Sequence, residues 1–351
     1  MQSTAVDDSP DATFRCEERR ELLRQIKEIL KCEVSPTAWA FLWLSDLTQL
    51  RQIVQLMQGS NLVAWAAVLT ATDLGLVGNT TGIRAHHTKV LAPAESESTP
   101  TTPTRTARSA TADAKCRERD QNQCVLTRYF HPIDVAHIYP LAMNKEQRTG
   151  TASFSFWNIL ELFWSKERVD AWYNAIFPRG TEVVENRLCF APHVRRWHEK
   201  GLFALRPIGI SDDGTKLTVK FFWLSQRLPS HTIDILETPT LLPEDPAHLP
   251  KNFRVWNAET QALIKCGDEI VLETHNPDTH PLPDVRLLEM QWMLQQLTAL
   301  SGAAEVNDSF RPEDDDDWED DAFSYDEYGY DNYADESPEP LRLPELILPV
   351  G

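Results

Sequence analysis

The chain has 351 residues, 42% hydrophobic and 25% charged, with a net charge of −19 that would disfavour a nucleic-acid partner if it were evenly spread. No N-terminal stretch has the basic, apolar and small-residue order of a secretion signal, and the longest apolar stretch, near 61–69, is too short to span a bilayer. Six scattered cysteines without a C-x-x-C pair indicate reduced thiols, so we expect an intracellular protein, nuclear or cytoplasmic and not secreted.

The chain before residue 82 predicts a small helical region. Residues 1–13 are polar, and we expect them to be disordered. Apolar residues recur at helical spacing over 14–31, and Ser35-Pro36 predicts the start of a second helix that continues to Gly59. A third helical stretch is expected near 62–71. This region, 14–81, offers no cluster of nucleophiles, bases or ligands, so we expect it to pack or to bind a protein partner.

The middle of the chain, 116–228, carries the candidate chemistry. It follows a segment, 82–115, whose Ser, Thr, Ala and Pro content predicts a flexible linker. Its first block, CVLTRYFHPIDVAHIYP, predicts short strands at 125–127 and 135–138, and His137 lies at the end of the second. Taken alone, such a histidine is more often a satisfied core residue than a catalytic group.

Two further blocks follow in the same segment. FWNILELFWSKERVDAWYNAIF has an aromatic and aliphatic stripe that predicts one scaffold helix. TEVVENRLCFAPHVRRWHEKGLFALRPI predicts a strand carrying Asn186, a helix opened by Pro192 and closed near Gly201, and a strand at 202–205. The mixture of helices and short strands predicts an α+β fold.

The end of the chain combines an extension with an acidic segment. The extension, 229–302, contains a strand candidate, DEIVLET, and a predicted helix near 284–300. Residues 305–345 contain 17 acidic residues and two arginines, whereas residues 116–227 contain 16 basic and 12 acidic residues. The middle segment is therefore mildly basic, which is compatible with phosphate binding. The acidic segment, 303–351, predicts a disordered tail or an interaction tail that competes with nucleic acid.

The ordered blocks of the middle segment resemble the HNH endonuclease family, and more narrowly the HNH modules of filamentous fungi. The resemblance rests on CVLT, AHIYP, the FW helix, GTEVVEN and GLFALRP, and it covers about 110 residues. It implies a ββα-metal module that hydrolyses phosphodiester bonds of DNA with one divalent metal ion, Mg²⁺, Mn²⁺ or Zn²⁺. One departure is Arg128, which stands where the family usually has glycine and is expected to tighten or distort that turn.

The resemblance assigns His137 the role of general base and Asn186 that of joining the two strands and fixing the imidazole. A neutral imidazole accepts the proton of an attacking water near pH 7. The family's metal-ligating histidine falls nine residues after the asparagine, where this chain has Arg195, and a guanidinium cannot bind a metal. At about 100° per residue along a helix, His198 is the better substitute ligand and His193 the poorer.

Arg195 leaves two interpretations open: a metal-dependent endonuclease, or a decayed HNH fold that binds nucleic acid or protein without catalysis. Arg195 and Arg196 are candidate phosphate-binding residues, with a solvated helix face as the alternative. Asp134 is a further candidate ligand, although a loop aspartate that caps a turn is commoner. Cys116 and Cys124, eight residues apart, are a weak candidate for zinc.

Overall fold

The computed structural model describes seven stretches of the chain, all within one compact unit, namely residues 10–59, 109–140, 156–177, 179–227, 231–245, 249–251 and 254–302. They form helices and small antiparallel sheets, which confirms the α+β class. None of the described helices has the length and apolarity needed to cross a membrane. The predicted helical stretch at 62–71, most of the predicted linker and the acidic segment 303–351 lie outside the described residues.

The N-terminal region contains a 3-10 turn, η1 (Pro10–Arg15), and three helices, α1 (Glu17–Leu30), α2 (Pro36–Leu44) and α3 (Leu47–Gln58). The turn begins within the segment expected to be disordered, and the buried side chain of Phe14 anchors it. The prediction of one helix from Pro36 to Gly59 is wrong, because the backbone is extended at Ser45 and Asp46. The Asp46 carboxylate accepts hydrogen bonds from Ser165 N and Arg168. These bonds connect the break between α2 and α3 to the break between the two helices of the aromatic block.

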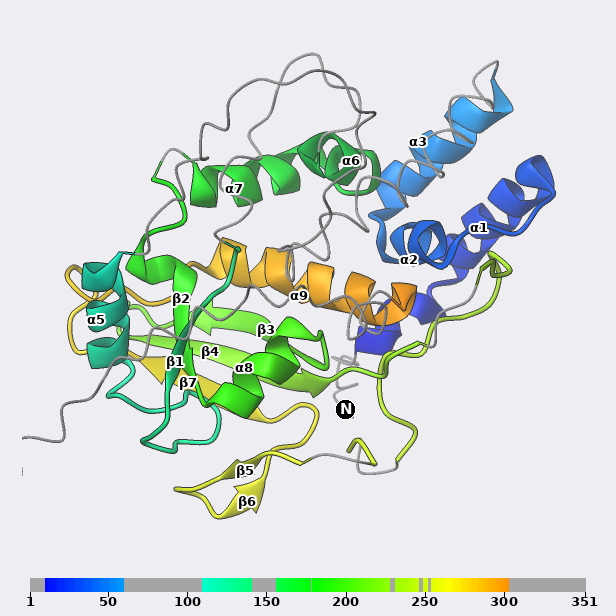
Figure 1. Ribbon diagram of the computed structural model, residues 1–351. Helices are drawn as coiled ribbons and strands as arrows, with labels where there is room; N and C mark the ends of the chain where they lie inside the picture. Colours follow the sequence, from blue (N-terminus) through cyan, green and yellow to red (C-terminus); the bar gives the residue numbers. More distant parts are fainter. Residues whose placement is uncertain are drawn as a thin grey trace, which may run out of the picture. The chain divides into compact units, whose positions relative to one another are not determined.

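The aromatic block also forms two helices instead of the single one predicted, α6 (Phe156–Phe163) and α7 (Lys166–Ile176). Ser165 caps the second helix, since its hydroxyl accepts a hydrogen bond from Arg168 N at 3.4 Å. The predicted C-terminal helix is confirmed as α9 (Val285–Ser301), which is buried on nearly every side. It lies between a three-stranded sheet and helices α2 and α7 (Figure 1), so it forms the centre of the core.

That sheet is antiparallel, in the order β3 (Phe203–Ile210), β4 (Lys216–Trp223) and β7 (Glu269–Glu273), and a small hairpin pairs β5 (Trp256–Asn257) with β6 (Ala262–Leu263). A second antiparallel pair joins β1 (Asp134–His137) and β2 (Arg187–Phe190), with His137 opposite Arg187. Helix α8 (Pro192–Glu199) follows β2 and packs against β1, β2 and β3. The hairpin-like pair with its following helix is the arrangement expected for a ββα module.

Two local predictions of this module need correction. Residues 125–127 form a turn, closed by a 2.9 Å hydrogen bond from Arg128 N to Cys124 O, and not a strand. Arg128 has a φ of 59°, the left-handed conformation that favours glycine.

Helix α5 (Ala110–Arg119) begins inside the segment predicted as linker, 82–115. The side chain of Ser109 caps it, and Ala112 and Cys116 are buried.

Candidate active site around His137 and Glu182

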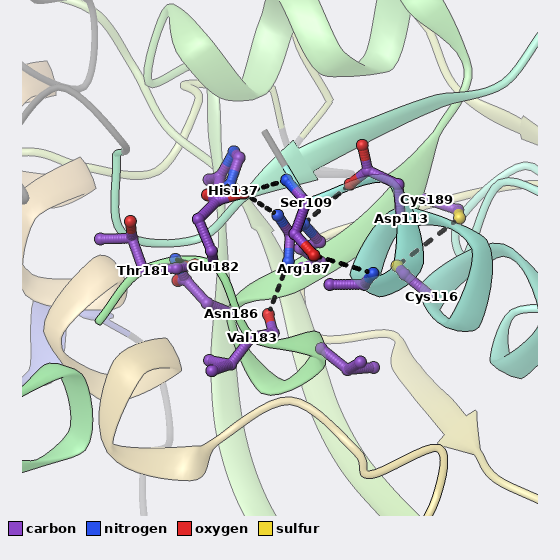
Figure 2. Close-up of polar contacts among 12 residues, drawn as sticks. Ser109, Asp113, Cys116, His137, Thr181, Glu182, Val183, Asn186, Arg187 and Cys189 are labelled. Carbon is purple, nitrogen blue, oxygen red and sulfur yellow. Dashed lines mark hydrogen bonds and ion pairs between the residues drawn. The ribbon is translucent and has the colours of Figure 1, made fainter. Parts of the chain in front are cut away.

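His137 lies at the end of β1, where its imidazole faces the carboxylate of Glu182. The distance from His137 Nε2 to Glu182 Oε1 is 2.8 Å, and both side chains are largely shielded from solvent, with 7% and 20% exposed. Figure 2 shows that Glu182 lies at the centre of a network that includes Ser109, Arg187 and Asp113. The sequence did not identify Glu182 as a site residue, although it belongs to the GTEVVEN block.

The Glu182 carboxylate lies within hydrogen-bonding distance of three groups, the His137 imidazole, the backbone N–H of Ser109 and the Arg187 guanidinium. Its Oε2 atom accepts hydrogen bonds from the backbone N–H of Ser109 at 2.6 Å and from Arg187 Nη2 at 2.5 Å. Burial raises the pKa of Glu182, but the hydrogen bond from Ser109 and the contacts with His137 and Arg187 outweigh it and hold the pKa below its usual range. Glu182 is therefore ionised at neutral pH and favours a hydrogen on the facing Nε2 of His137.

Arg187 completes the network from the neighbouring strand. Its side chain is fully buried, and its Nε atom lies 2.8 Å from Asp113 Oδ1 on α5. The buried guanidinium is thus flanked by two carboxylates, those of Asp113 and Glu182. A buried cation needs such partners, because it has lost its hydration. Helix α5 is part of the site for this reason, although its sequence resembles the linker before it.

Asn186 makes hydrogen bonds to the backbone segments that carry His137 and Glu182. Its Oδ1 accepts a hydrogen bond from Tyr139 N at 2.7 Å, and its Nδ2 donates to Tyr139 O at 2.9 Å and to Thr181 O at 3.0 Å. Tyr139 follows His137 by two residues, and Thr181 directly precedes Glu182. One buried amide therefore holds the segments that carry both members of the pair.

Arg195 is engaged by carboxylates on α8 and β1. Its Nε donates to Glu199 Oε1 at 2.8 Å, and its Nη1 lies 3.5 Å from Asp134 Oδ2. Its neighbour Arg196 is more exposed and lies 4.0 Å from Glu199. Asp134, the weak candidate for a metal ligand, therefore faces a permanent cation instead of an open coordination position.

His198 and His193, the substitute ligands, lie on different faces of α8. His198 is buried against Phe190 and Phe203, with ring centroids 5.2 Å and 5.5 Å away, and burial lowers its pKa to about 4. His193 is exposed beside Trp197, and desolvation lowers its pKa from the usual value of histidine. His198 is 6% exposed and packs between two phenylalanine rings, so it fills a core position.

A divalent metal does not fit the described residues around Arg195. Two groups of three potential ligands occur in the described part of the chain, with donor atoms within 4.8 Å of one another. Neither group includes His137, His193 or His198. The first comprises Cys116, Asp120 and Cys189, and the second comprises Glu118, His275 and His280.

The first group is a buried thiol cluster that is already occupied by a guanidinium. Cys116 Sγ lies 3.8 Å from Cys189 Sγ, so its thiol neighbour is Cys189 and not Cys124. Arg119 Nη2 lies 3.4 Å from Cys116 Sγ and 3.1 Å from Asp120 Oδ2. The contact with Cys116 and burial raise the pKa of Cys189, so its thiol stays protonated. None of the six cysteines, all of which lie in the described stretches, forms a disulfide bond.

Comparison with protein families matches residues 124–206 to the HNH endonuclease family. The matched segment contains the β1–β2 pair, α8 and the start of β3, and hence His137, Asn186 and Arg195. No curated protein and no solved structure matches the chain. The resemblance to the HNH family is confirmed for this segment, which indicates a nuclease-type or nucleic-acid-binding function. The relation to fungal modules stays a prediction.

Proposed function

We propose that this chain is an HNH-type nuclease that hydrolyses phosphodiester bonds, those of DNA first, with His137 as its general base. The observation that carries the proposal is the 2.8 Å contact between His137 Nε2 and Glu182 Oε1. An ionised Glu182 favours the tautomer with the hydrogen on Nε2 and the lone pair on Nδ1. When Nδ1 takes the proton of an attacking water, the imidazolium stays paired with the carboxylate, which lowers the cost of the charge.

Asn186 acts as a positioning residue in this proposal. Its three hydrogen bonds hold Tyr139 and Thr181, which lie close in sequence to His137 and Glu182, and the residue is 1% exposed. Arg187 acts on Glu182 in the same indirect way, because its buried cation favours the ionised carboxylate. These contacts support the role proposed for His137, which does not depend on which cation offsets the charge of the phosphate.

Nicking of supercoiled plasmid by the purified full chain tests this proposal. We expect nicking in a panel of Mg²⁺, Mn²⁺ and Zn²⁺ buffers, and its loss in His137→Ala with an unchanged circular dichroism spectrum. His231→Ala, which removes an exposed imidazole elsewhere, is the matched control and should nick like the wild type. Nicking that survives His137→Ala would refute the assignment of the base.

A second candidate function, nucleic-acid binding without cleavage, is favoured by Arg195. Its guanidinium stands where the family's ligand is expected and is paired with Asp134 and Glu199. This alternative predicts salt-dependent DNA binding by the wild type in every metal buffer, without nicking. It also predicts that Arg195→His creates affinity for a divalent ion that the native α8 lacks. Nicking by the wild type that is lost in His137→Ala excludes it.

A further inference from the structure

The second group of potential ligands lies at the far end of α5, away from the His137–Glu182 pair. Glu118 is in the last turn of α5, and His275 and His280 lie in the loop between β7 and α9. His280 Nε2 is 2.9 Å from Glu118 Oε2, and His275 Nε2 is 3.8 Å from Glu118 Oε1. The two imidazole centroids are 4.5 Å apart. Two imidazoles and one carboxylate therefore converge on one point of the surface.

We propose that Glu118, His275 and His280 form a binding site for a borderline divalent metal ion of the Zn²⁺ type. Around such an ion, tetrahedral ligands with bonds of about 2.0–2.2 Å have donor atoms about 3.3–3.6 Å apart. The observed contacts of 2.9 Å and 3.8 Å, made to the two different oxygens of Glu118, lie on either side of this range. All three residues have ligand atoms within 4.8 Å of one another, so side-chain rotations can bring them around one ion. Two imidazoles select Zn²⁺, Co²⁺, Ni²⁺ or Cu²⁺ over Mg²⁺ and Ca²⁺, which prefer oxygen ligands.

The loop that carries the histidines is held in shape by its own hydrogen bonds. Asn276 Oδ1 accepts from the backbone N–H groups of Asp278 and Thr279, at 3.0 Å and 3.1 Å. The hydroxyl of Thr274 donates to His280 O at 2.6 Å. Thr279 Oγ1 lies 2.9 Å from His280 Nδ1, so it can accept the Nδ1 hydrogen and leave the Nε2 lone pair for a metal. The imidazole of His280 is thus presented in the orientation that a ligand needs.

The site joins α5, which also supports the candidate active site, to the loop between β7 and α9. Next to Glu118, the buried side chain of Arg119 donates to Arg187 O at 2.7 Å and to Pro281 O at 3.0 Å. Helix α5 therefore spans from the loop to the strand of Arg187, and Figure 1 shows it beside both. A metal at this end would fasten α5 to the loop that leads into α9. With three protein ligands, it would keep one position for water or a further ligand.

Titration of the full, chelator-treated chain with Zn²⁺ tests the site. Excess Mg²⁺ in the buffer occupies carboxylates of the acidic segment, so that calorimetry reports the imidazole-containing site. We expect His275→Ala and His280→Ala each to weaken Zn²⁺ binding by about 100-fold or more, and Thr279→Val by about 10-fold. His231→Ala, again the exposed control, should bind like the wild type.

A second measurement locates the ion. The imidazole NMR signals of His275 and His280 should shift on stoichiometric Zn²⁺ addition, whereas those of His231 should not. Wild-type chain that binds no Zn²⁺ in excess Mg²⁺ overturns the proposal. Unchanged Zn²⁺ affinity in the His275→Ala/His280→Ala double variant overturns it equally. Because neither readout uses cleavage or His137, failure of this proposal is distinct from failure of the proposed nuclease function.

Discussion

Replacement of His198 by phenylalanine tests whether this residue belongs to the core or to a metal site. In the folded chain, burial against Phe190 and Phe203 lowers the pKa of His198 to about 4. In the unfolded chain the pKa of histidine is about 6.5. The unfolded state therefore takes up a proton at higher pH than the folded state, and stability is lost as the pH falls from about 7 towards 4.

The size of this loss follows from the two pKa values. It amounts to about 2 kcal/mol at pH 5 and about 3 kcal/mol once both states are protonated. His198→Phe keeps an aromatic ring in the same space and removes the titration. Relative to the wild type, its free energy of unfolding should therefore gain about 2 kcal/mol more at pH 5 than at pH 8, measured by urea denaturation at both pH values.

The matched control is His193→Phe, because His193 is exposed on the same helix. This control should change the pH dependence of unfolding much less. Identical pH dependence in the wild type and His198→Phe would refute the burial of a neutral imidazole at this position. Loss of divalent-ion binding in His198→Phe would instead identify His198 as a ligand and contradict its assignment to the core.

Three further substitutions, Glu182→Gln, Asn186→Ala and Gly201→Ala, test the network and its frame by denaturation, and Glu185→Gln is the control for the first. Glu182→Gln should lower the free energy of unfolding by about 2–3 kcal/mol at pH 7, and the difference should shrink at acid pH, where the wild-type carboxylate is protonated too. Glu185→Gln, whose partner Arg179 is half exposed, should cost less than about 1 kcal/mol. Asn186→Ala should cost about 3 kcal/mol or more, because three backbone groups lose their partner. Gly201→Ala should cost about 2 kcal/mol, since φ is +63° and a Cβ would lie 2.8 Å from Gln295 Oε1. An unaltered midpoint in any of the three would contradict the contacts assigned to it.

Elements with strong local signals were predictable from the sequence. The apolar stripe of α9, the Pro192 start of α8 and the alternation in β7 are set by neighbouring residues. The helix breaks at Ser45 and Ser165 were missed because the apolar stripe continues through them. At these breaks polar groups form hydrogen bonds between different helices, as Ser165 N does with the Asp46 carboxylate. The spacing of apolar residues does not reveal such long-range contacts.

In the candidate site, too, residues within a sequence block could be predicted, whereas contacts between residues distant in sequence could not. Asn186 could be selected from its sequence block alone, and its side chain makes hydrogen bonds to the backbone of Tyr139. Glu182 is 45 residues from His137, so their contact depends on the pairing of β1 with β2. For His198, helical geometry gives the angle between its side chain and that of Arg195 around α8. It does not show which face of α8 is buried. That face is set by Phe203, which lies on the next strand.

The most direct test of the central claim is the cleavage rate of a labelled DNA duplex by the wild type and by His137→Ala, with and without added imidazole. A general base contributes about 10²–10⁴-fold, so the substitution should lower the rate by at least about 100-fold. Free imidazole should restore part of the lost rate, because it supplies the missing proton acceptor. Equal cleavage by the wild type and His137→Ala would contradict the account.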